Sequence, residues 1–457
     1  MLYDIVVIGG GTGGYVSAIK AAQMGAKVCL IEKDSIGGTC LNRGCIPTKT
    51  LLKCSQIYNI VKDGQDYGIE GIDPYKISVN IDKIIDKKNM IVKDLKYGIE
   101  CLLAENKVDY LNGKAEVLNK TNVIVGNNKV QTKNLIIATG AEPAIIPIDG
   151  LKDGMKSGFV ITSNEALDLR KLPKKLTIIG GGVIGVELAT FFNNIGVNVS
   201  IIEMQKEIIP TVDSEISASL KKYLISKGID IYVEAKAKSI RENSIKIEYQ
   251  NLEKTIDADL VILAVGRVPR TEGLENLSIK MEKKAILTNN KMETNIPGVY
   301  AIGDVTGKFQ LAHVASKEGC VAVENALGKK SNMNYNVIPQ CIYTSPQIAS
   351  VGMTEAAAVE KGYNIKVGKF PMYANSKASI EGQKEGFAKI ICDSKYGEVL
   401  GIHLFGENAT EIILSGVISL NMEASIEDIA NAISPHPSVS ETITESAQAA
   451  IFKAIHI

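Results

Sequence analysis

Two cysteines, Cys40 and Cys45, are the residues whose types and spacing best suit chemistry. They lie five positions apart in the string Gly-Thr-Cys-Leu-Asn-Arg-Gly-Cys-Ile-Pro-Thr-Lys, residues 38–49. On a regular α-helix, residues five apart are rotated by about 140°, so a disulfide between them would need a distorted turn. Gly44 and Pro47 would permit such a distortion, and a strained, accessible disulfide is readily reduced. The pair is a candidate redox disulfide, with two structural thiols or half of a zinc site as the alternatives.

Metal binding is the weaker alternative for this pair. The spacing does not match the usual zinc pair, and the sequence has no second close pair of cysteines, so we expect no metal. The chain has eight cysteines, which are too scattered for a secreted disulfide framework. Most of the others, such as Cys29, Cys320 and Cys341, are therefore expected to be reduced and buried.

His436 and Glu441 could supply the proton transfers that thiol chemistry needs. Imidazole is the side chain that exchanges protons near neutral pH, and a neighbouring carboxylate can orient it. Two structural interpretations compete with this one. A histidine beside prolines is usually structural, and the segment from Ser438 to Glu441, before a helical run, has the form of a capping box.

The redox string follows a segment that has the form of a dinucleotide-binding βαβ unit. The motif Gly9-x-Gly11-x-x-Gly14 stands between an apolar run and a helical stretch, and Glu32 closes the next apolar run. The expected strand, helix and return strand cover residues 4–8, 15–24 and 27–31. These glycines permit a tight turn, the approach of backbone amides to a diphosphate and close helix packing, while the acid binds a ribose. A glycine-rich turn without a ligand is the simpler alternative.

A second segment repeats the arrangement. Gly180-x-Gly182-x-x-Gly185 lies between a strand from residue 175 and a helix, and the return strand, 198–202, ends at Glu203. A carboxylate at this place binds the free ribose hydroxyl and repels a 2′-phosphate, and no arginine follows to compensate. NAD is therefore favoured over NADP, and two dinucleotide sites in one chain suggest two cofactors.

The remaining elements indicate the fold class. Short apolar strands that end in glycine are expected at residues 135–138, 260–265 and 299–302, where they would feed ligand-facing loops. From about Val337 the pattern changes to strands such as 387–392 and 400–405, followed by helices. The sequence thus predicts an α/β protein with two Rossmann-like dinucleotide-binding domains and a C-terminal α+β domain. The lysine-rich stretch 81–96 is expected to be a solvated helix face.

Composition limits the function classes. At 457 residues the chain is long enough for two to four domains. Its 51 basic and 51 acidic side chains balance, so nothing indicates nucleic acid or a membrane as a partner. The absence of a basic n-region and of any long apolar stretch leads us to expect a cytoplasmic protein.

The whole chain resembles the pyridine nucleotide-disulfide oxidoreductases. The resemblance rests on the cysteine string and on five further motifs in the family's order. These are Ala138-Thr-Gly140, Val265-Gly-Arg267, Ala301-Ile-Gly-Asp304, Leu311-Ala-His313 and His436-Pro-Ser-Val-Ser-Glu441. The resemblance implies an enzyme that passes electrons between NAD and a dithiol through FAD and a Cys40–Cys45 disulfide.

The resemblance also assigns residues to the two cofactors. FAD would contact Gly9, Gly11, Gly14, Glu32, Lys33, Thr39, Lys49, Lys114, Ala115, Thr139, Gly140, Asp304, Leu311, Ala312 and His313. NAD would contact Gly180, Gly182, Val183, Ile184, Gly185, Glu187, Glu203 and Gly266.

The family gives the catalytic residues separate roles. Cys40 would exchange with the substrate, and Cys45 would lie against the flavin with Lys49 and Glu187 paired nearby. His436 would be the base and Glu441 its orienter. In relatives this histidine completes the active site of the other subunit, so a homodimer is implied.

Within the family, the cysteine string most resembles members that oxidise a protein-bound dihydrolipoyl group with NAD⁺. The group would arrive on a lipoyl carrier of a 2-oxoacid dehydrogenase or glycine cleavage system. Three alternatives fit less well. Glutathione-type reductases prefer NADP, which conflicts with Glu203, and mercuric reductases should carry a cysteine pair, which the chain lacks after Cys392. A noncatalytic scaffold would not need the intact thiols.

The sequence departs from the family pattern at two positions, with Arg43 in place of a common valine and Ser434 in place of a second histidine. Arg43 would add positive charge near the thiols and alter substrate preference or redox poise.

The expected domain boundaries follow from the same resemblance. An FAD domain would span residues 1–146 and be completed by residues 267–335. The NAD domain would be inserted at residues 147–266, and residues 336–457 would form the interface, or dimerisation, domain.

Overall fold

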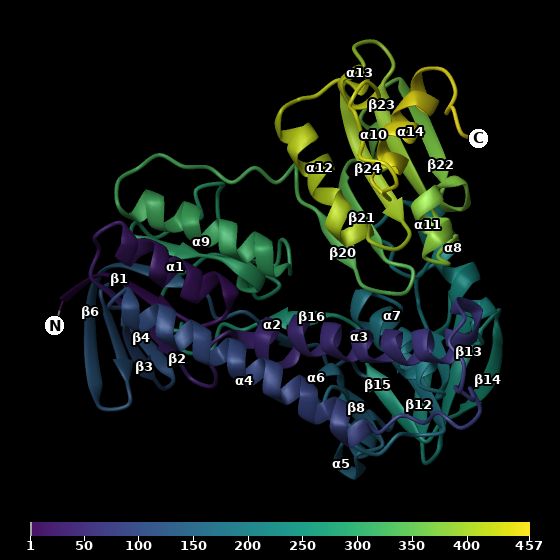
Figure 1. Cartoon of the computed structure of the whole chain (residues 1–457). Coiled ribbons are helices and arrows are strands. Elements are labelled where there is room, and N and C mark those ends of the chain that lie inside the picture. Colours follow the sequence, from purple (N-terminus) through teal and green to yellow (C-terminus); the bar gives the residue numbers. More distant parts are fainter. Residues whose placement is uncertain (1) are drawn as a thin grey trace.

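Three large sheets of different strand order organise the chain, which a computed structural model describes from residue 2 to residue 457 (Figure 1). Two are built on parallel central strands and carry the glycine-rich motifs, and the third is antiparallel and C-terminal. The expected fold class, two Rossmann-like units and a C-terminal α+β unit, is confirmed. The domain boundaries at residues 146, 266 and 335 stay predictions.

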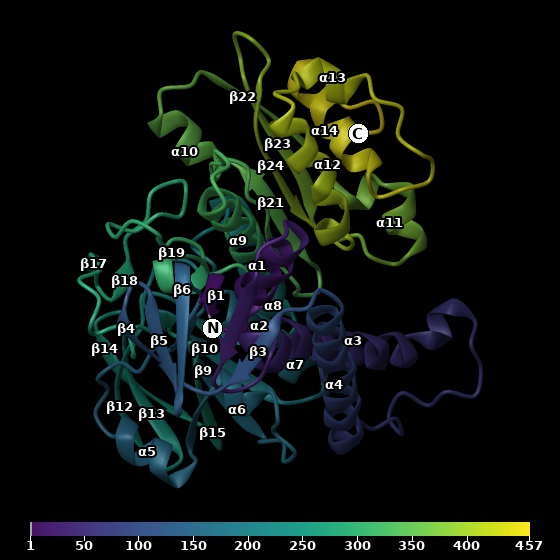
Figure 2. The same cartoon turned by 90° about the vertical axis from the view of Figure 1, so that its left-hand side faces the viewer.

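The first sheet has the order β3-β2-β1-β6-β5-β4, with β19 paired to β6. Its strands are β1 Leu2–Ile8, β2 Val28–Glu32, β3 Asp109–Asn112, β4 Ala115–Asn119, β5 Asn122–Val125, β6 Asn128–Ile137 and β19 Val299–Ala301. β1 pairs in parallel with β2 and β6, and its residues from Ile5 to Val7 are fully buried. A strand covered on both faces favours a continuous apolar run, which is what the sequence has here. Helices α1 (Thr12–Gln23) and α9 (Ala312–Ala326) pack together over it (Figure 2).

The second sheet has the order β11-β10-β9-β15-β8 and repeats the βαβ plan. Its strands are β8 Val160–Thr162, β9 Lys175–Ile179, β10 Asn198–Ile202, β11 Asp230–Tyr232 and β15 Leu260–Leu263. Its helices are α5 Leu151–Ser157, α6 Ser163–Ala166, α7 Val183–Asn194 and α8 Ser214–Ser226. An antiparallel sheet of β12 Lys236–Arg241, β13 Ser244–Tyr249 and β14 Leu252–Asp257 packs beside it.

The third sheet has the order β20-β21-β24-β23-β22 and is antiparallel throughout. Its strands are β20 Gln340–Ile342, β21 Ile348–Gly352, β22 Ile365–Pro371, β23 Phe387–Asp393 and β24 Val399–Phe405. β23 and β24 are buried along their whole length. The helices of this part are α10 Glu355–Glu360, α11 Ser376–Ile380, α12 Ala409–Asn421, α13 Ile426–Ala430 and α14 Glu441–Ile451. α12 and α14 cover one face of this sheet, and the other face packs against α10 and, through Phe387 and Phe405, against the cluster that contains α3 and α7, which explains why these strands are buried on both faces.

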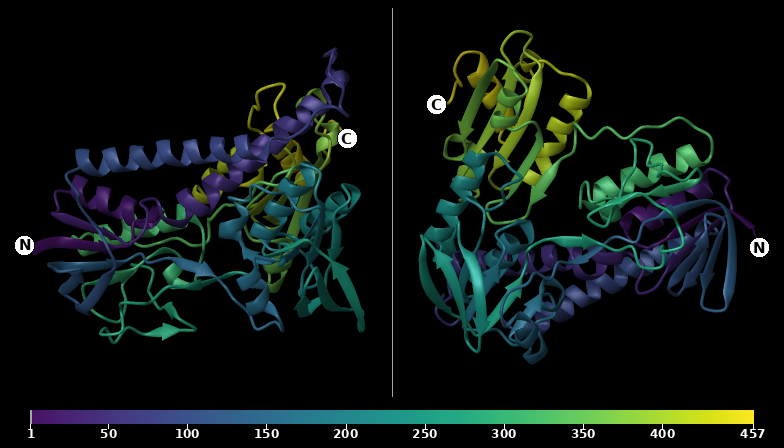
Figure 3. Two further views of the ribbon diagram at one scale, coloured as in Figure 1. Left: turned by 90° about the horizontal axis from the view of Figure 1, so that it is seen from below. Right: turned by 180° about the vertical axis from the view of Figure 1, so that it is seen from behind.

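The smaller elements connect the sheets. They are the helices α2 Gly38–Arg43, α3 Cys45–Lys62 and α4 Ile81–Glu105, the 3₁₀ turns η1 Gly64–Tyr67, η2 Gly303–Thr306 and η3 Met372–Ala374, and the strand pairs β7 Ala141–Pro143 with β16 Arg267–Pro269 and β17 Met281–Glu282 with β18 Ala285–Ile286. α3 and α4 run side by side from the first sheet toward the second (Figure 3, left). The lysine-rich stretch is therefore helical as expected, and the helix extends further than the lysines.

One apolar cluster joins the parts that carry the chemistry. Leu51 of α3, Phe191 of α7 and Phe405 of β24 belong to the same buried cluster. The redox helix is thus packed against the second βαβ unit and connected to the C-terminal sheet, which lies beside that unit (Figure 3, right). None of the helices between residues 2 and 457 is long and apolar enough to cross a membrane.

Candidate active site

A break between two helices positions the two cysteines. Cys40 lies in α2, Cys45 is the first residue of α3, and Gly44 separates them with φ −151° and ψ −112°. A Cβ at this glycine would lie 2.9 Å from the Thr39 carbonyl oxygen, so a larger residue would force the turn apart. The distortion expected from the sequence is therefore at Gly44. Pro47 does not contribute to it, because it lies in the first turn of α3, where a missing N–H costs no helical hydrogen bond.

The two sulfurs interact as thiols. A hydrogen bond from Cys40 to Cys45 lowers the pKa of Cys45 to about 7, against the effect of burial and with the help of the Lys49 charge. The same contact and burial raise the pKa of Cys40. Cys45 is the sulfur that carries negative charge near neutral pH, and Cys40 holds the proton. This asymmetry suits a pair in which one sulfur leaves as a thiolate while the other exchanges with substrate.

Lys49 and Glu187 form the charged support behind Cys45. The Lys49 Nζ atom lies 2.8 Å and 2.7 Å from the two Glu187 carboxylate oxygens, one turn of α3 beyond the cysteine. Burial would lower the pKa of Lys49, but the Glu187 carboxylate outweighs it and the pKa is raised. Tyr343, which the sequence did not single out, donates its backbone N–H to Glu187 at 2.8 Å and places its ring 4.6 Å from Nζ. The lysine is therefore a fixed positive charge beside the thiolate.

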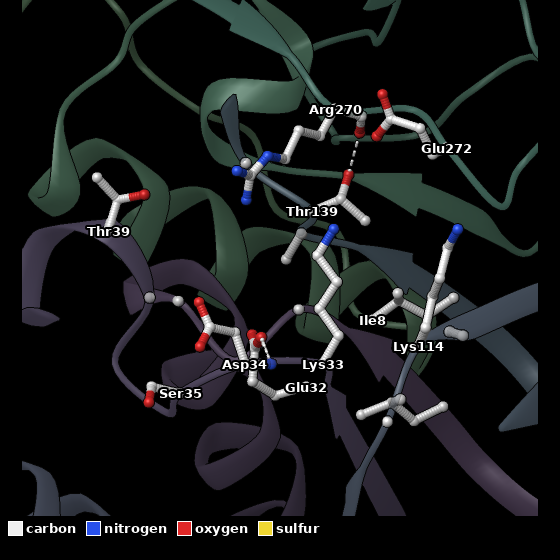
Figure 4. Close-up of a pocket in the computed structure, with 18 of the residues that line it drawn as sticks. Ile8, Glu32, Lys33, Asp34, Ser35, Thr39, Lys114, Thr139, Arg270 and Glu272 are labelled. Carbon is white, nitrogen blue, oxygen red and sulfur yellow. Dashed lines mark hydrogen bonds between the residues drawn. The ribbon is translucent and has the colours of Figure 1, made fainter. Parts of the chain in front are cut away.

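A cavity borders the first βαβ unit, on the side of the redox helix (Figure 4). Its lining includes Gly9, Gly11, Glu32, Lys33, Thr39, Lys114, Ala115, Thr139 and Gly140 of the expected FAD residues. It also includes Asp34, Ser35, Arg43, Asn164, Arg267, Arg270 and Glu272, which the sequence did not assign to the cofactor. The motif Val265-Gly-Arg267 was visible in the sequence, and its arginine could have been assigned.

The glycines of this unit are required by close backbone contacts. Gly9 has φ +106°, and a Cβ there would lie 2.1 Å from the Ala138 carbonyl oxygen. A Cβ on Gly14 would lie 1.8 Å from the Gly9 carbonyl oxygen. Gly11 precedes α1 with nothing nearer to its Cβ position than Gly38 Cα at 3.9 Å, so the approach to the helix N-terminus is open. This is the geometry that lets a diphosphate reach backbone amides.

Two further observations show that the cavity fits FAD. Glu32 accepts hydrogen bonds from the backbone N–H of Gly10 at 2.6 Å and of Asp34 at 2.7 Å, which holds the carboxylate at the end of β2 where a ribose-binding acid belongs. Arg267 has a buried Nε atom without a hydrogen-bond partner among the described residues. A buried donor without a partner is costly, and an oxygen-rich ligand in the cavity would satisfy it.

The second βαβ unit repeats this geometry closely. Gly180 has φ +112°, and a Cβ on Gly185 would lie 2.0 Å from the Gly180 carbonyl oxygen. Glu203 accepts hydrogen bonds from the backbone N–H of Gly181 at 2.6 Å and of Gln205 at 2.7 Å, as Glu32 does in the first unit. α7 begins at Val183 after Gly182, which brings Ile184 into its first turn, and Gly266 follows β15 with φ +108°. These residues have the geometry of a second dinucleotide site, and their contact with NAD stays a prediction.

Some expected FAD residues lie beside the cavity and not in its lining. Asp304 is in η2, where its carboxylate lies 3.9 Å from Arg267 Nε, and burial raises its pKa against the effect of that arginine. Leu311 and Ala312 begin α9, and His313 Nε2 lies 2.9 Å from the Pro339 carbonyl oxygen. Contact of these residues with FAD stays a prediction.

His436 and Glu441 form the second chemical pair. His436 Nδ1 donates to Glu441 Oε1 at 2.9 Å, because a carboxylate can only accept. Burial would raise the pKa of Glu441, but the backbone N–H of Ser438, at 2.8 Å from Oε2, and the His436 imidazole outweigh it and lower the pKa. The histidine is therefore held with Nε2 free to take a proton, and 68% of its side chain is exposed.

One half of the capping interpretation is confirmed, because the Glu441 carboxylate accepts from the Ser438 backbone N–H at 2.8 Å, as the acid of a capping box does. α14 begins at Glu441 itself, and its N-cap, Ser440, makes no side-chain capping bond. The reciprocal half is missing, because among the described hydrogen bonds the Ser438 hydroxyl pairs with the Ser440 hydroxyl at 2.7 Å and not with a backbone N–H of the helix. Ser434 donates to or accepts from Thr444 at 2.6 Å, which ties the histidine loop to the helix.

Within one chain the two chemical pairs stay apart. α14, which carries Glu441, lies at the far side of the third sheet from α2, which carries Cys40 (Figure 1). None of the described hydrogen bonds of His436 reaches either cysteine. The structure thus brings Cys40, Cys45, Lys49 and Glu187 together, and separately His436 and Glu441.

The remaining cysteines do not all follow the expectation. Cys29 is a buried thiol as predicted. The prediction is wrong for Cys320 and Cys341, which are thiols but only half-buried. Cys341 lies on β20, the edge strand of its sheet. Gly319 lies on the face of α9 that packs against α1, so Cys320, the next residue of the helix, points away from that contact.

Comparisons with known proteins match this geometry over nearly the whole chain. Residues 3–319 match the family described as pyridine nucleotide-disulphide oxidoreductase, and residues 338–447 match its dimerisation domain. A dihydrolipoyl dehydrogenase of Bacillus subtilis is 39% identical, with 99% of each chain covered. A mitochondrial dihydrolipoyl dehydrogenase of Arabidopsis thaliana is 38% identical over 99% of this chain and 91% of its own.

Solved structures agree with these sequence matches. The HOCl-induced flavoprotein disulfide reductase RclA of Escherichia coli superposes with a TM-score of 0.85 at 30% identity, covering 98% of this chain and 99% of that one. Fold, glycine-rich units and redox string therefore coincide with one family. The chain belongs to the pyridine nucleotide-disulphide oxidoreductases.

Proposed function

We propose that the chain oxidises a protein-bound dihydrolipoyl group to its disulfide and reduces NAD⁺ to NADH. The observation that carries the proposal is the Cys40–Cys45 pair, whose thiolate member is supported by Lys49 and whose helix packs against the NAD-type unit. The full-length dihydrolipoyl dehydrogenases at 38–39% identity support this substrate class. The lipoyl carrier would belong to a 2-oxoacid dehydrogenase or glycine cleavage system, and a cytoplasmic location is part of the same proposal.

The thiol exchange follows from the asymmetry of the two sulfurs. In the oxidised enzyme a substrate thiolate attacks Cys40 Sγ, the Cys40–Cys45 bond breaks, and Cys45 leaves as the thiolate that its lowered pKa favours. The second substrate thiolate then attacks the substrate sulfur bound to Cys40. The lipoyl disulfide forms, and Cys40 is released and protonated. The enzyme holds the two electrons as the Cys40 thiol and Cys45 thiolate.

His436 would move the protons of this exchange. Its Nε2 is free because Glu441 holds Nδ1, so it can accept the proton of each substrate thiol and return one to Cys40. Because His436 is separated from Cys40 within one chain, the proposed enzyme is a homodimer in which each site takes this base from its partner. The match of residues 338–447 to the dimerisation domain supports that arrangement.

FAD, when bound, would carry the two electrons from the Cys45 side to the nicotinamide. The chain's part is to hold the two dinucleotides at the junction of its βαβ units and to keep Lys49 beside the thiolate. Glu203 would bind the NAD ribose and disfavour NADP, which argues against a glutathione-type reductase.

A paired assay tests the function. The purified protein should be yellow, and NAD⁺ should be reduced in the presence of dihydrolipoamide, with Cys40→Ser and Cys45→Ser abolishing the reaction. Glutathione disulfide with NADPH is the matched alternative. Faster turnover of that pair than of dihydrolipoamide with NAD⁺ would replace the proposal with a reductase. A colourless protein that still binds a lipoyl carrier complex would favour the scaffold role.

A further inference from the structure

Arg43 lies on a different side of its helix from the one that its place between the two cysteines suggests. It ends α2, the six-residue helix that carries Cys40, and its charge was expected to lie near the thiols. The structure places it in the lining of the dinucleotide cavity, with its Nη2 donating to the Asp34 carboxylate. The guanidinium therefore belongs to the cofactor side of the helix.

The ion pair alone does not explain this placement. The Arg43 and Asp34 side chains are 38% and 53% exposed, and a single ion pair at such exposure contributes little to stability. What the pair does is fix the direction of the guanidinium. Asp34 follows the ribose-binding acid by two residues, so the pair connects the exit of β2 to the end of α2, and both segments line the cavity.

The backbone shows which part of the cofactor lies near this guanidinium. Gly11, the N-cap of α1, forms a bridge with Gly37, and the Gly37 N–H donates to the Gly10 carbonyl at 2.8 Å. The first turn of α2 is thus held against the N-terminus of α1, where a diphosphate binds. Arg43 lies only about 9 Å along the helix axis from the first turn of α2, and an arginine side chain that extends toward the helix N-terminus can span much of that distance.

The other two arginines of the cavity are held by groups that the cofactor would not touch, although Arg267 also keeps a buried Nε without a partner among the described residues. Arg267 donates to the Ala141 carbonyl at 2.6 Å, and Arg270 Nε lies 3.2 Å from Glu142. Arg43 differs because its partner, Asp34, is itself part of the cavity wall. An arginine fork held by one carboxylate keeps further N–H donors for phosphate oxygens.

We propose that Arg43 binds the diphosphate of FAD and that Asp34 orients its guanidinium. The inference rests on FAD occupying this cavity, and the experiment below separates it from that assumption. Arg43 replaces a common apolar residue of the family string, so it is a contact specific to this chain and its like, added to the backbone cradle at Gly11.

FAD binding to the deflavinated protein tests the proposal. The dissociation constant would be measured by quenching of flavin fluorescence for wild type, Arg43→Met, Arg43→Lys and Asp34→Asn, with circular dichroism to show that each is folded. Arg241→Met is the matched control, because Arg241 forms an exposed pair with Asp149 away from the cavity. Arg43→Met should weaken FAD binding by roughly tenfold or more, the usual effect of losing a hydrogen bond to a charged group. Arg43→Lys should lose less, and Arg241→Met should not differ from wild type.

ADP and adenosine as competitors locate the contact. ADP carries a diphosphate and adenosine carries none, so Arg43→Met should weaken ADP and leave adenosine unchanged. Asp34→Asn should cost less than Arg43→Met, and the double variant should be no worse than Arg43→Met alone.

Three results would overturn the inference. These are FAD affinity of Arg43→Met within twofold of wild type, equal losses for ADP and adenosine, or tighter FAD binding by Asp34→Asn. Failure of the wild-type protein to bind FAD would instead contradict the proposed function, so the two outcomes are distinguishable.

Discussion

Lys49 and Glu187 are 138 positions apart in the sequence, and the lysine Nζ lies 2.8 Å and 2.7 Å from the two carboxylate oxygens. The pair fastens α3, which carries the redox cysteine, to α7, which begins the NAD-type unit. The Lys49 charge helps to lower the pKa of Cys45, whereas the Glu187 charge opposes that effect. Glu187 of the second βαβ unit therefore fixes the position of the Lys49 charge, and this charge acts on Cys45 of the redox helix α3.

Removal of the Lys49 charge should shift the titration of Cys45. The thiolate forms as pH rises through a pKa of about 7, set first by the Cys40 hydrogen bond and also by Lys49. Lys49→Met should raise that pKa by about one unit or more, so the thiolate would appear only at higher pH. The measurement is long-wavelength absorbance of the two-electron-reduced protein against pH. Lys53→Met, one turn further along α3 and bonded to Gln56, is the control, and equal titrations for all three proteins would contradict the role of Lys49.

Serine substitutions should separate the two cysteines by spectrum. A Cys45 thiolate beside oxidised flavin should give a long-wavelength band after limited reduction. Cys45→Ser should abolish the band, because the charge-donating sulfur is gone. Cys40→Ser should show the band without reductant, because Cys45 then has no disulfide partner. A band that is insensitive to Cys45→Ser would assign the thiolate to another cysteine.

Most of the local geometry could be read from the sequence. Gly9 and Gly180 stand where a Cβ would strike a carbonyl oxygen, so the backbone itself requires glycine at both positions. The acids at the ends of β2 and β10, Glu32 and Glu203, were likewise visible because spacing along a βαβ unit fixes where such an acid lies.

Contacts between distant segments were less accessible. Tyr343 supports the Lys49 pair through a backbone N–H, which any residue could donate, so no side-chain pattern marks it. Arg43 faces the dinucleotide cavity from the last position of α2, next to the break at Gly44, and the direction of a side chain at such a break depends on backbone angles that the sequence does not reveal. The sequence shows that an arginine lies between the two cysteines, but only the structure shows that it lines the dinucleotide cavity.

Cofactor choice should follow Glu203. Its carboxylate is fixed by two backbone N–H groups, so it cannot turn away from a 2′-phosphate. We expect kcat/KM for NADH to exceed that for NADPH by at least roughly tenfold, about 1.4 kcal/mol. Glu203→Ala should narrow this ratio, while Glu253→Ala, an exposed position on β14, should leave it unchanged. Comparable values for the two cofactors in the wild-type protein would show that Glu203 does not select between them.

A buried lysine should be important for the contact between the second and third sheets. Lys389 on β23 is 3% exposed and lies 3.1 Å from Asp213, which is 2% exposed, and 2.7 Å from Glu355. Lys389→Met would leave a buried carboxylate without its partner, a change that typically costs about 3–5 kcal/mol. We expect a drop of several degrees in Tm by differential scanning calorimetry.

Lys369→Met is the matched control for this stability prediction. Lys369 lies on the neighbouring strand β22 and pairs with Glu215, but its side chain is 43% exposed. Exposed pairs contribute little, so its Tm should stay close to that of wild type. Equal Tm values for Lys389→Met and Lys369→Met would contradict this prediction, because they would mean that an apolar side chain at position 389 stabilises the protein as well as the buried ion pair does.

The assignment of His436 as base and Glu441 as its orienter can be decided by kinetics. His436→Gln should lower the rate with dihydrolipoamide by on the order of 10² to 10⁴-fold, the usual contribution of general acid-base catalysis. It should leave FAD binding and reduction by NADH largely intact, because those steps do not use this proton. An unchanged dithiol rate would end the assignment.

Glu441→Gln distinguishes orientation from a structural role. The wild-type carboxylate accepts from both His436 Nδ1 and the Ser438 N–H, and glutamine can replace only one of these acceptors without turning its amide donors toward the other group. If Glu441 stabilises the imidazolium, Glu441→Gln should slow dithiol oxidation and move its pH profile, because a neutral amide supports a positive charge less well than a carboxylate. If Glu441 only holds the start of α14, Tm should fall while the rate per folded enzyme and its pH profile stay unchanged. Measuring both quantities on the same preparation decides between the two roles.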